Sequence, residues 1–183
     1  MPVLSPQLIK SFLDYLKFQK RYSQHTIISY QNDLSSFFDF VSTGFGQMEI
    51  GQLNASIIRS WLASLKEQSM ESKSINRKIS TLKSFFKYQL KQGNIITSPM
   101  TTIVSPKIKK RLPQFVDEKD VTVLFNHVEF PDDWKGRTER LIMFLFYNTG
   151  IRQAELVSLK ERQVDKSNRS LKVLGKGNKE RVI

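Results

Sequence analysis

Apolar residues recur three to four positions apart through roughly the first hundred residues, the spacing of helices with one buried face. Ser23 and Asn54 each precede such a run and are typical N-cap residues, whereas Gly44 is a typical helix terminator. The pattern therefore predicts an all-helical first module. Its four helices are expected over residues 5–20, 23–44, 54–65 and 72–92.

The fourth predicted helix carries an apolar face and a cationic flank on separate arcs. The apolar face, within about 80° of arc, is predicted to be a core stripe. It consists of Ile75, Ile79, Leu82, Phe86 and Leu90. The cationic flank, within about 120° of arc, consists of Lys73, Arg77, Lys83, Lys87 and Lys91. A merely solvated face would normally include acidic residues, and none occurs over 72–92, so this flank is expected to contact DNA.

A proline-containing segment, residues 97–114, follows the helical module and is expected to be extended. The boundary is placed after Ser105, which gives a helical module over residues 1–105 and a second module over residues 106–183. The cations of this segment are Lys107, Lys109, Lys110 and Arg111. They form either a solvated linker or a contact that follows a phosphate backbone, and both interpretations stay open.

The second module mixes helices with strands. Its helices are expected from Asp117 to about Phe125, from about Lys135 to Asn148 and from Gln153 to Leu159. The middle one is apolar almost all round, which predicts that it is buried. Leu171 and Val173 alternate with polar neighbours, so residues 170–183 are predicted to form a strand, a tight turn and a second strand. The expected fold class is mainly α, with a small antiparallel sheet.

The charge of the chain indicates its partner. The sequence has 29 Lys and Arg against 17 Asp and Glu, a net charge of +12, with a pI near 9.9. Residues 1–105 carry 12 basic and 6 acidic residues and residues 106–183 carry 17 and 11, so each module has an excess of +6. Clustered cations bind phosphates and release counterions, which favours a nucleic acid over a generally basic surface. Two equally basic modules favour a protein that holds a nucleic acid between two surfaces over one with a single docking patch.

Composition excludes several other kinds of site. The absence of cysteine excludes disulfides, thiolate zinc sites, iron–sulfur clusters and cysteine nucleophiles. Two histidines argue against a histidine-built metal site, so neither a metal nor a cofactor is expected. No apolar run approaches the roughly 18 residues of a membrane span, and no membrane partner is expected. The first ten residues lack the features of a signal or transit peptide, which favours the cytoplasm.

Two short segments of the second module carry candidate chemistry. Arg152 is expected at a helix start, where a guanidinium can grip a phosphate bidentately. Glu155 can face and orient Arg152, although a local surface ion pair is the commoner meaning of this spacing. The GKGNK segment lacks the G-x-x-x-x-G-K-[ST] pattern of a phosphate loop, so nucleotide binding is rejected. It instead places Lys176 at a hairpin tip small enough to enter a groove, near Lys179 and Arg181.

Together these segments resemble the tyrosine recombinases, the family of phage integrases and Xer-like site-specific recombinases. Residues 23–34 are similar to the second core-binding helix of the family, residues 74–88 to the fourth, and residues 106–113 to the linker before the catalytic domain. The segments TGIRQAEL and GKGNKER, taken with their separation, make the match specific. The resemblance implies a SAM-like helical core-binding domain of four or five helices, followed by the start of an α+β catalytic domain with a lysine hairpin.

The resemblance also implies roles by position. Arg152 matches the first catalytic arginine of the family, which binds the scissile phosphate and stabilises its charge in the transition state. Lys176 matches the hairpin lysine that protonates the leaving 5′ oxygen, and Glu155 matches an acidic position that supports the arginine. In the family a tyrosine attacks the phosphate to form a 3′-phosphotyrosyl link, without metal or cofactor. The implied partner is double-stranded DNA, on which the family works as a homotetramer.

The chain departs from the family pattern after GKGNKER. In the family an H-x-x-R motif, a further His or Trp and the tyrosine nucleophile lie beyond this hairpin, and the sequence carries none of them there. Its tyrosines are interpreted as core or interface aromatics; they are Tyr15, Tyr22, Tyr30, Tyr88 and Tyr147. We therefore expect an amino-terminal piece of a recombinase, a monomer or non-native dimer that binds DNA without cutting it. The alternatives are a naturally short DNA-binding regulator or decoy, and an RNA-binding protein without a recognisable RNA-binding signature.

Overall fold

The computed structural model describes residues 2–108, 112, 114–175 and 179–183. The chain divides into two compact units, Met1–Arg111 (unit 1) and Leu112–Ile183 (unit 2). The boundary expected after Ser105 lies in the same proline-containing segment as this division. None of the described helices is long and apolar enough to cross a membrane.

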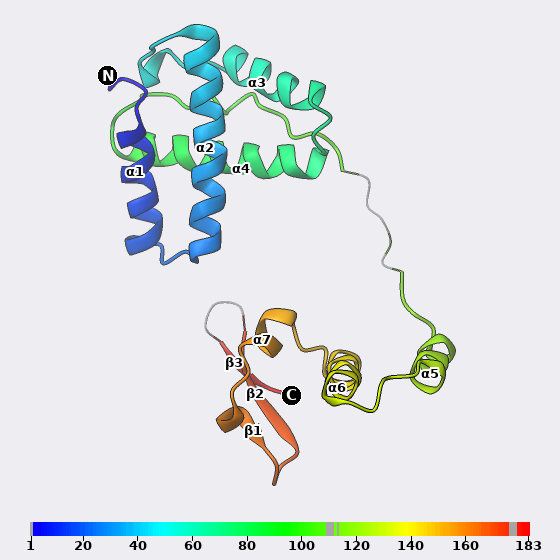
Figure 1. Cartoon of the computed structure of the whole chain (residues 1–183). Helices are drawn as coiled ribbons and strands as arrows, with labels where there is room; N and C mark the ends of the chain where they lie inside the picture. The colour runs from blue at the N-terminus through cyan, green and yellow to red at the C-terminus, as the bar shows by residue number, and fades with distance from the viewer. Residues whose placement is uncertain (1, 109–111, 113, 176–178) are drawn as a thin grey trace. The chain divides into compact units, whose positions relative to one another are not determined.

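Unit 1 is helical (Figure 1). Its elements are α1 (Pro6–Asp14), the π-helix η1 (Tyr15–Gln19), α2 (Gln24–Phe45), the 3-10 helix η2 (Ile50–Gln52), α3 (Ala55–Glu67) and α4 (Ser72–Lys91). The predicted caps are confirmed: Ser23 Oγ accepts the Thr26 N–H at 3.3 Å, and Asn54 Oδ1 accepts two N–H groups of the first turn of α3. The predicted end of α2 at Gly44 is wrong, because α2 runs to Phe45 and its C-cap is Gly46, whose φ of 73° glycine adopts without steric cost.

The core of unit 1 is rich in aromatic rings that join its four α-helices. Phe12 of α1 packs edge-on against Phe85 of α4, with 5.5 Å between ring centroids. Phe37 of α2 packs in the same way against Trp61 of α3 at 5.0 Å. Because all four rings are excluded from solvent, these contacts fix how the helices pack.

The predicted core stripe of α4 is confirmed at four positions and wrong at the fifth. Ile75, Ile79, Leu82 and Phe86 are buried, whereas Leu90 is 36% exposed. The buried arc also includes Phe85 and Gln89 and is centred nearer to them, which puts Leu90 just beyond its edge.

Unit 2 contains helices and a small sheet. Its elements are α5 (Glu118–His127), α6 (Trp134–Thr149), α7 (Gln153–Val157), the 3-10 helix η3 (Glu161–Gln163), β1 (Val164–Asp165), β2 (Ser170–Leu174) and β3 (Glu180–Val182). The strands form an antiparallel sheet in the order β1-β2-β3, with Val173 opposite Arg181. The predicted strand pair is confirmed as β2 and β3. The sequence did not reveal β1, because its two residues are too few to show an alternating pattern.

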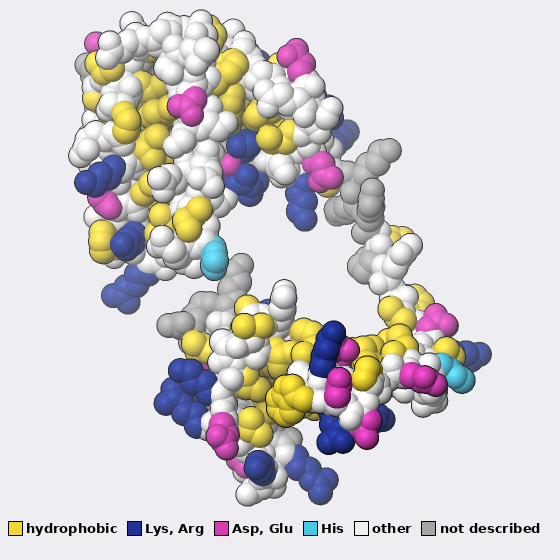
Figure 2. All heavy atoms as spheres, viewed as in Figure 1, with side chains coloured by type: hydrophobic (Ala, Val, Ile, Leu, Met, Phe, Trp, Pro, Cys, Tyr) yellow, Lys and Arg dark blue, Asp and Glu magenta, His cyan; other side chains and the backbone are white. Residues whose placement is uncertain are grey.

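The prediction that the apolar helix of the second module is buried is wrong for α6. Leu141 and Tyr147 are 58% and 55% exposed, and Figure 2 shows hydrophobic side chains gathered over this helix. Phe125 of α5 packs on Phe144 with 4.4 Å between ring centroids. The described part of unit 2 covers α6 on this side but leaves its other apolar faces open. An apolar helix needs surrounding elements for burial, and this unit supplies few of them.

Candidate functional site

Arg152 and Glu155 lie at the start of α7, directly after the sharp end of α6. Gly150 ends α6 in the left-handed conformation, with φ 59°, and Ile151 is buried, so the turn is anchored in the unit. Arg152 is the N-cap residue of α7, and Glu155 Oε2 accepts its backbone N–H at 2.9 Å. Glu155 Oε1 also accepts a hydrogen bond from Arg152 Nη1 at 2.8 Å. The same carboxylate therefore fixes both the backbone and the side chain of Arg152.

A second arginine reaches Glu155 from the sheet. Arg181 of β3 lies opposite Val173 of β2, and directly paired residues of antiparallel strands project from the same face. Val173 is buried, so Arg181 also projects toward the interior of unit 2. Its Nη2 donates to Glu155 Oε2 at 2.7 Å and to the Gly150 carbonyl at 3.3 Å. The cluster of Arg152, Glu155 and Arg181 joins α7 to β3, and we call it the arginine clamp.

The arginine clamp has more positive than negative charge, and its charged groups differ in exposure. The Glu155 side chain is 3% exposed, whereas that of Arg152 is 61% exposed. Hydrogen bonds from the Arg181 side chain and from the Arg152 backbone, together with the Arg152 side chain, lower the pKa of Glu155 to about 2 against the opposing effect of burial. Glu155 is therefore ionised near neutral pH. Two guanidinium groups against one carboxylate leave an excess of one positive charge, which Arg152 presents to solvent.

The hairpin after β2 begins beside the arginine clamp. The Gly175 N–H donates to the Lys179 carbonyl at 2.7 Å, which closes the base of the turn. A Cβ atom added to Gly175 would lie 3.3 Å from Glu155 Oε1 and 3.7 Å from Arg152 Nη1. Glycine thus allows the hairpin backbone to approach the clamp closely. Lys176, the predicted hairpin lysine, lies outside the described residues. Lys179 is described and is exposed.

The predicted cationic flank of α4 contains two kinds of residue. Lys73, Lys83, Lys87 and Lys91 are exposed, and none of them forms an ion pair with a described carboxylate. We call these four residues the α4 basic face. The lysines at 83, 87 and 91 are spaced four residues apart, where like charges destabilise a helix by about 0.2–0.5 kcal/mol per pair. An anion bound along this face would relieve that repulsion.

Arg77, the fifth predicted contact, is held by a buried carboxylate. It donates to Asp33 and to Ser29 on α2, and its side chain is 48% exposed. Asp33 is 1% exposed and also accepts from Lys78 Nζ at 3.1 Å and from Thr81 Oγ1 at 2.8 Å. Both oxygens of the carboxylate are therefore bonded to side chains of α4. Arg77 keeps an exposed surface but is fixed in place, unlike the lysines of the α4 basic face.

The linker cations are described in part. Lys107 is exposed, whereas Lys109, Lys110 and Arg111 lie outside the described residues. The linker starts on the surface of α4, because Asn76 Nδ2 donates to the Pro106 carbonyl at 2.9 Å.

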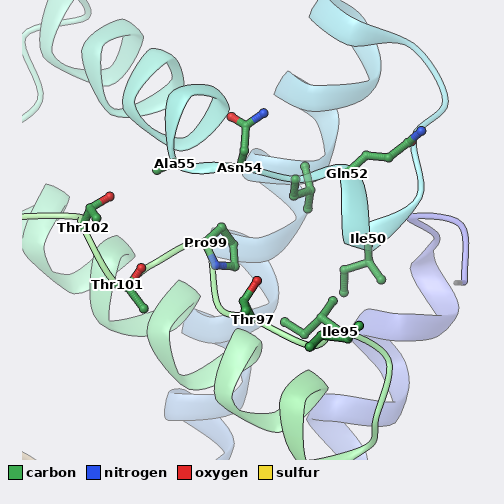
Figure 3. A pocket seen from close by; sticks show the side chains of 12 residues that line it. Ile50, Gln52, Asn54, Ala55, Ile95, Thr97, Pro99, Thr101 and Thr102 are labelled. Atoms are coloured by element: carbon green, nitrogen blue, oxygen red, sulfur yellow. The ribbon is translucent and has the colours of Figure 1, made fainter.

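One cavity of unit 1 offers little chemistry. This cavity of about 500 Å³ lies between η2, the start of α3 and residues 95–102. Figure 3 shows Ile50 and Ile95 near one another, with Thr101 and Thr102 further along. No charged side chain lines this cavity. Across the described residues, no three His, Asp or Glu side chains gather in a group that could hold a metal ion.

Comparison with known proteins identifies the family of the chain. Residues 9–93 match the phage integrase N-terminal SAM-like domain, and residues 114–183 match the phage integrase family. The tyrosine recombinase XerC of Staphylococcus saprophyticus is 38% identical over 174 residues, which are 95% of this chain and 58% of that relative. The chain belongs to the tyrosine recombinase family. XerC of Staphylococcus carnosus is 37% identical with the same coverage, so this recombinase chain spans 58% of the length of these curated relatives.

Solved structures of integrases share the fold of this tyrosine recombinase chain. A lambda integrase(75-356) dimer bound to a COC′ core site matches it with a TM-score of 0.73 and 18% identity, over 97% of this chain and 58% of that one. The Tn1549 transposon integrase in complex with circular intermediate DNA matches with a TM-score of 0.62 and 14% identity, over 96% and 58%. At these identities the likeness concerns the fold.

Sequence reasoning on this recombinase chain missed three contributors to its candidate sites. Arg181 was expected to contact DNA, but it also bonds Glu155 and so supports the arginine clamp. Asp33 and Lys78 were not singled out. A signal for Asp33 was present, because it stands among Tyr30, Leu34 and Phe37, where an acidic residue is rare unless it is paired. For Lys78 the signal was its place inside the apolar arc of α4.

Proposed function

We propose that this chain binds duplex DNA and presents a scissile phosphate to Arg152, in strand cleavage and rejoining by a site-specific tyrosine recombinase. The observation that carries the proposal is the arginine clamp: a buried, ionised Glu155 fixes an exposed guanidinium and leaves it an excess positive charge. A fixed guanidinium binds a phosphate bidentately and stabilises the charge that develops during its attack. In this proposal Arg152 is the catalytic residue, while Glu155 and Arg181 are positioning residues.

Unit 1 supplies the affinity for DNA in this proposal. The α4 basic face and Arg77 line one flank of a single helix, and a helix flank of cations matches the spacing of backbone phosphates. The matching lambda integrase was solved bound to a COC′ core site and the matching Tn1549 integrase in complex with circular intermediate DNA, which supports DNA as the partner here. Since duplex DNA is the proposed partner, the proposed location is the cytoplasm.

The 183 residues are proposed to bind DNA without cleaving it. The sequence contains no His-x-x-Arg segment, so it lacks the second arginine that the family uses at the phosphate. The ring centroids of Tyr147 in α6 and of Phe125 are 5.9 Å apart, so the two rings pack together. The remaining four tyrosines belong to unit 1. We therefore propose that none of these tyrosines is a nucleophile.

Fluorescence anisotropy with a labelled 30-bp duplex tests the proposal for unit 1. The chain should bind with an affinity that falls steeply as KCl rises, and Lys83→Glu/Lys87→Glu/Lys91→Glu should weaken binding by about 100-fold or more at 0.1 M salt. The matched control, Lys66→Glu/Lys119→Glu/Lys160→Glu, makes the same change in charge at exposed positions outside the α4 basic face. Equal losses in the two triple variants would contradict the assignment of this face, and preferential binding of duplex RNA would contradict DNA as the partner.

A nicked suicide duplex tests the proposal for unit 2. The 183-residue chain should form no covalent adduct with it on a denaturing gel, and an adduct would show that one of the five tyrosines is a nucleophile. Arg152→Gln should lower affinity for the duplex by about eightfold at 0.1 M salt, the effect of losing one phosphate contact. Arg162→Gln, which removes an exposed arginine outside the clamp, is the control and should change affinity less than twofold.

A further inference from the structure

The turn between η1 and α2 has an unusual backbone that the proposed function does not explain. Tyr15–Gln19 form a π-helical turn, in which the Lys20 N–H donates to the Tyr15 carbonyl at 3.1 Å. Arg21 follows in the left-handed conformation with φ 53°, which is unfavourable for a residue with a long side chain. π-helical turns are rare and are frequent at functional sites. Leu16 anchors the start of this turn in the core, but all residues from Lys17 to His25 are exposed, so packing does not account for the left-handed backbone of Arg21.

A hollow of about 400 Å³ opens beside this turn. Its lining consists of Tyr15, Leu16, Lys20, Tyr22, Ser84, Lys87, Tyr88 and Lys91, and we call it the basic-aromatic pocket. The π-helical turn places Lys20 near the ring of Tyr15, with Nζ 5.9 Å from the ring centroid. Lys91 Nζ lies 5.6 Å from the same centroid, and the ring of Tyr88 lies 4.8 Å from it. Figure 2 shows Lys and Arg side chains around this end of unit 1.

The charges in the basic-aromatic pocket favour the binding of an anion. Three ammonium groups line it, no acidic side chain does, and none of the three lysines forms an ion pair with a described carboxylate. Lys87 and Lys91 are also spaced four residues apart on α4, where like charges repel. A lysine binds a phosphate as a point charge, and tyrosine rings offer flat apolar surface to a sugar or base. The pocket thus combines the two kinds of contact that a nucleotide unit requires.

We infer that the basic-aromatic pocket holds one backbone phosphate of the bound DNA, with the adjoining deoxyribose against the ring of Tyr22. The inference rests on the proposed function and extends it, because Lys87 and Lys91 belong both to the pocket and to the α4 basic face. A strand that follows α4 therefore reaches Lys20 without leaving a positively charged surface. The footprint of unit 1 on DNA extends around the end of α4 onto the turn between η1 and α2.

Paired lysine variants test this inference by anisotropy with the 30-bp duplex in 0.05–0.3 M KCl. Lys20→Gln removes a charge from the pocket, and Lys10→Gln removes one from an exposed position of α1 outside it. Lys20→Gln should reduce the slope of log affinity against log salt by about 0.9, which is about eightfold in affinity at 0.1 M. Lys10→Gln should change affinity less than twofold.

Tyr22→Leu separates the aromatic contact from the charge. Tyr22 is 42% exposed and can be replaced with little disturbance of the core, which the emission of the buried Trp61 checks. This neutral variant should weaken binding about threefold or more at every salt concentration and leave the salt slope unchanged. A Lys20→Gln variant that binds like Lys10→Gln, while the unaltered chain still binds duplex, would overturn the pocket alone. An unaltered chain that fails to bind duplex would overturn the proposed function itself.

Discussion

Each unit buries a carboxylate that holds two cationic side chains, and the two arrangements differ in where their partners come from. Asp33 of α2 binds Arg77 and Lys78, and both of them, with Thr81, belong to α4. Glu155 binds Arg152 at the start of its own helix and Arg181 from β3. Asp33 therefore ties together two helices of one core, whereas Glu155 ties a helix start to a strand at the base of a hairpin.

The surroundings of the two carboxylates differ more than their bonds do. Asp33 lies beside an aromatic core that closes around α1, α2, α3 and α4. In the described part of unit 2 the buried apolar side chains are few: Val121, Ile151 and Val173. In unit 1 a large apolar cluster packs besides the bonds of Asp33, which fix how α2 pairs with α4. In unit 2 the polar bonds of Glu155 carry a larger share of the local order.

The largest expected effect on stability comes from removing an aromatic ring, which should cost more in unit 1 than in unit 2. Phe85→Ala should lower the free energy of unfolding of unit 1 by about 3–5 kcal/mol, because a fully buried ring leaves a cavity. Phe144→Ala in α6 should cost less than about 1 kcal/mol, since that ring is already 39% exposed. Urea unfolding followed by Trp61 emission measures the first, because Trp61 is buried in unit 1 while Trp134 is exposed in unit 2. Equal costs in the two units would contradict the comparison.

The next largest effect concerns the bonds that Asp33 accepts from α4 in unit 1. Asp33→Asn should destabilise unit 1 by about 3 kcal/mol, because it leaves Lys78 buried without a counter-charge. Trp61 emission in urea again measures the loss, and Lys78 also lies over the Trp61 ring at 5.6 Å, so the folded-state emission should change as well. Asp39→Asn, an exposed acidic residue of the same helix, is the control and should stay within about 0.5 kcal/mol. A matching loss in Asp39→Asn would indicate a general charge effect instead.

The third effect is the pH dependence of the arginine clamp. The pKa of Glu155 is lowered from its ordinary value of 4.5 to about 2, so its contribution to stability is complete above about pH 4.5 and is lost as the pH falls toward 2. Hydrogen exchange of the β2 and β3 amides should therefore speed up over this range beyond its intrinsic change. Glu155→Gln should exchange faster than the unaltered chain at neutral pH and lose that additional dependence. A variant with the pH profile of the unaltered chain would show that Glu155 does not hold the strands.

The contrast between the units also explains what could be predicted from the sequence. Unit 1 follows local rules: Ser23 and Asn54 cap helices, and Ile75 and Ile79 lie where their spacing places them. Arg152 and Glu155 were predicted to meet because they are three residues apart. Such features depend on short stretches of chain, which a single sequence displays directly.

What the sequence did not reveal depends on contacts between distant residues. Arg181 meets Glu155 across 26 positions, and Asp33 meets Lys78 across 45, so neither pair follows from spacing along one helix. The exposure of α6 was missed for a related reason. An apolar helix shows that it requires burial, but its sequence does not show whether neighbouring elements provide it.

The smallest expected effect comes from replacing glycine by alanine. This substitution should lower the stability of unit 2 at Gly175 and raise that of unit 1 at Gly44. Gly175→Ala places a Cβ 3.3 Å from Glu155 Oε1 and from the Lys179 carbonyl, so the clamp must shift by a few tenths of an ångström. We expect a loss of up to about 1 kcal/mol in unit 2, seen as hydrogen exchange up to about fivefold faster in β2 and β3. Gly44→Ala in the last turn of α2 meets open space and should stabilise unit 1 by about 0.5–1 kcal/mol, because alanine favours a helix. Unchanged or slower hydrogen exchange in Gly175→Ala would show that the hairpin backbone does not need glycine to approach the clamp, and a loss of stability in Gly44→Ala would contradict the opposite signs.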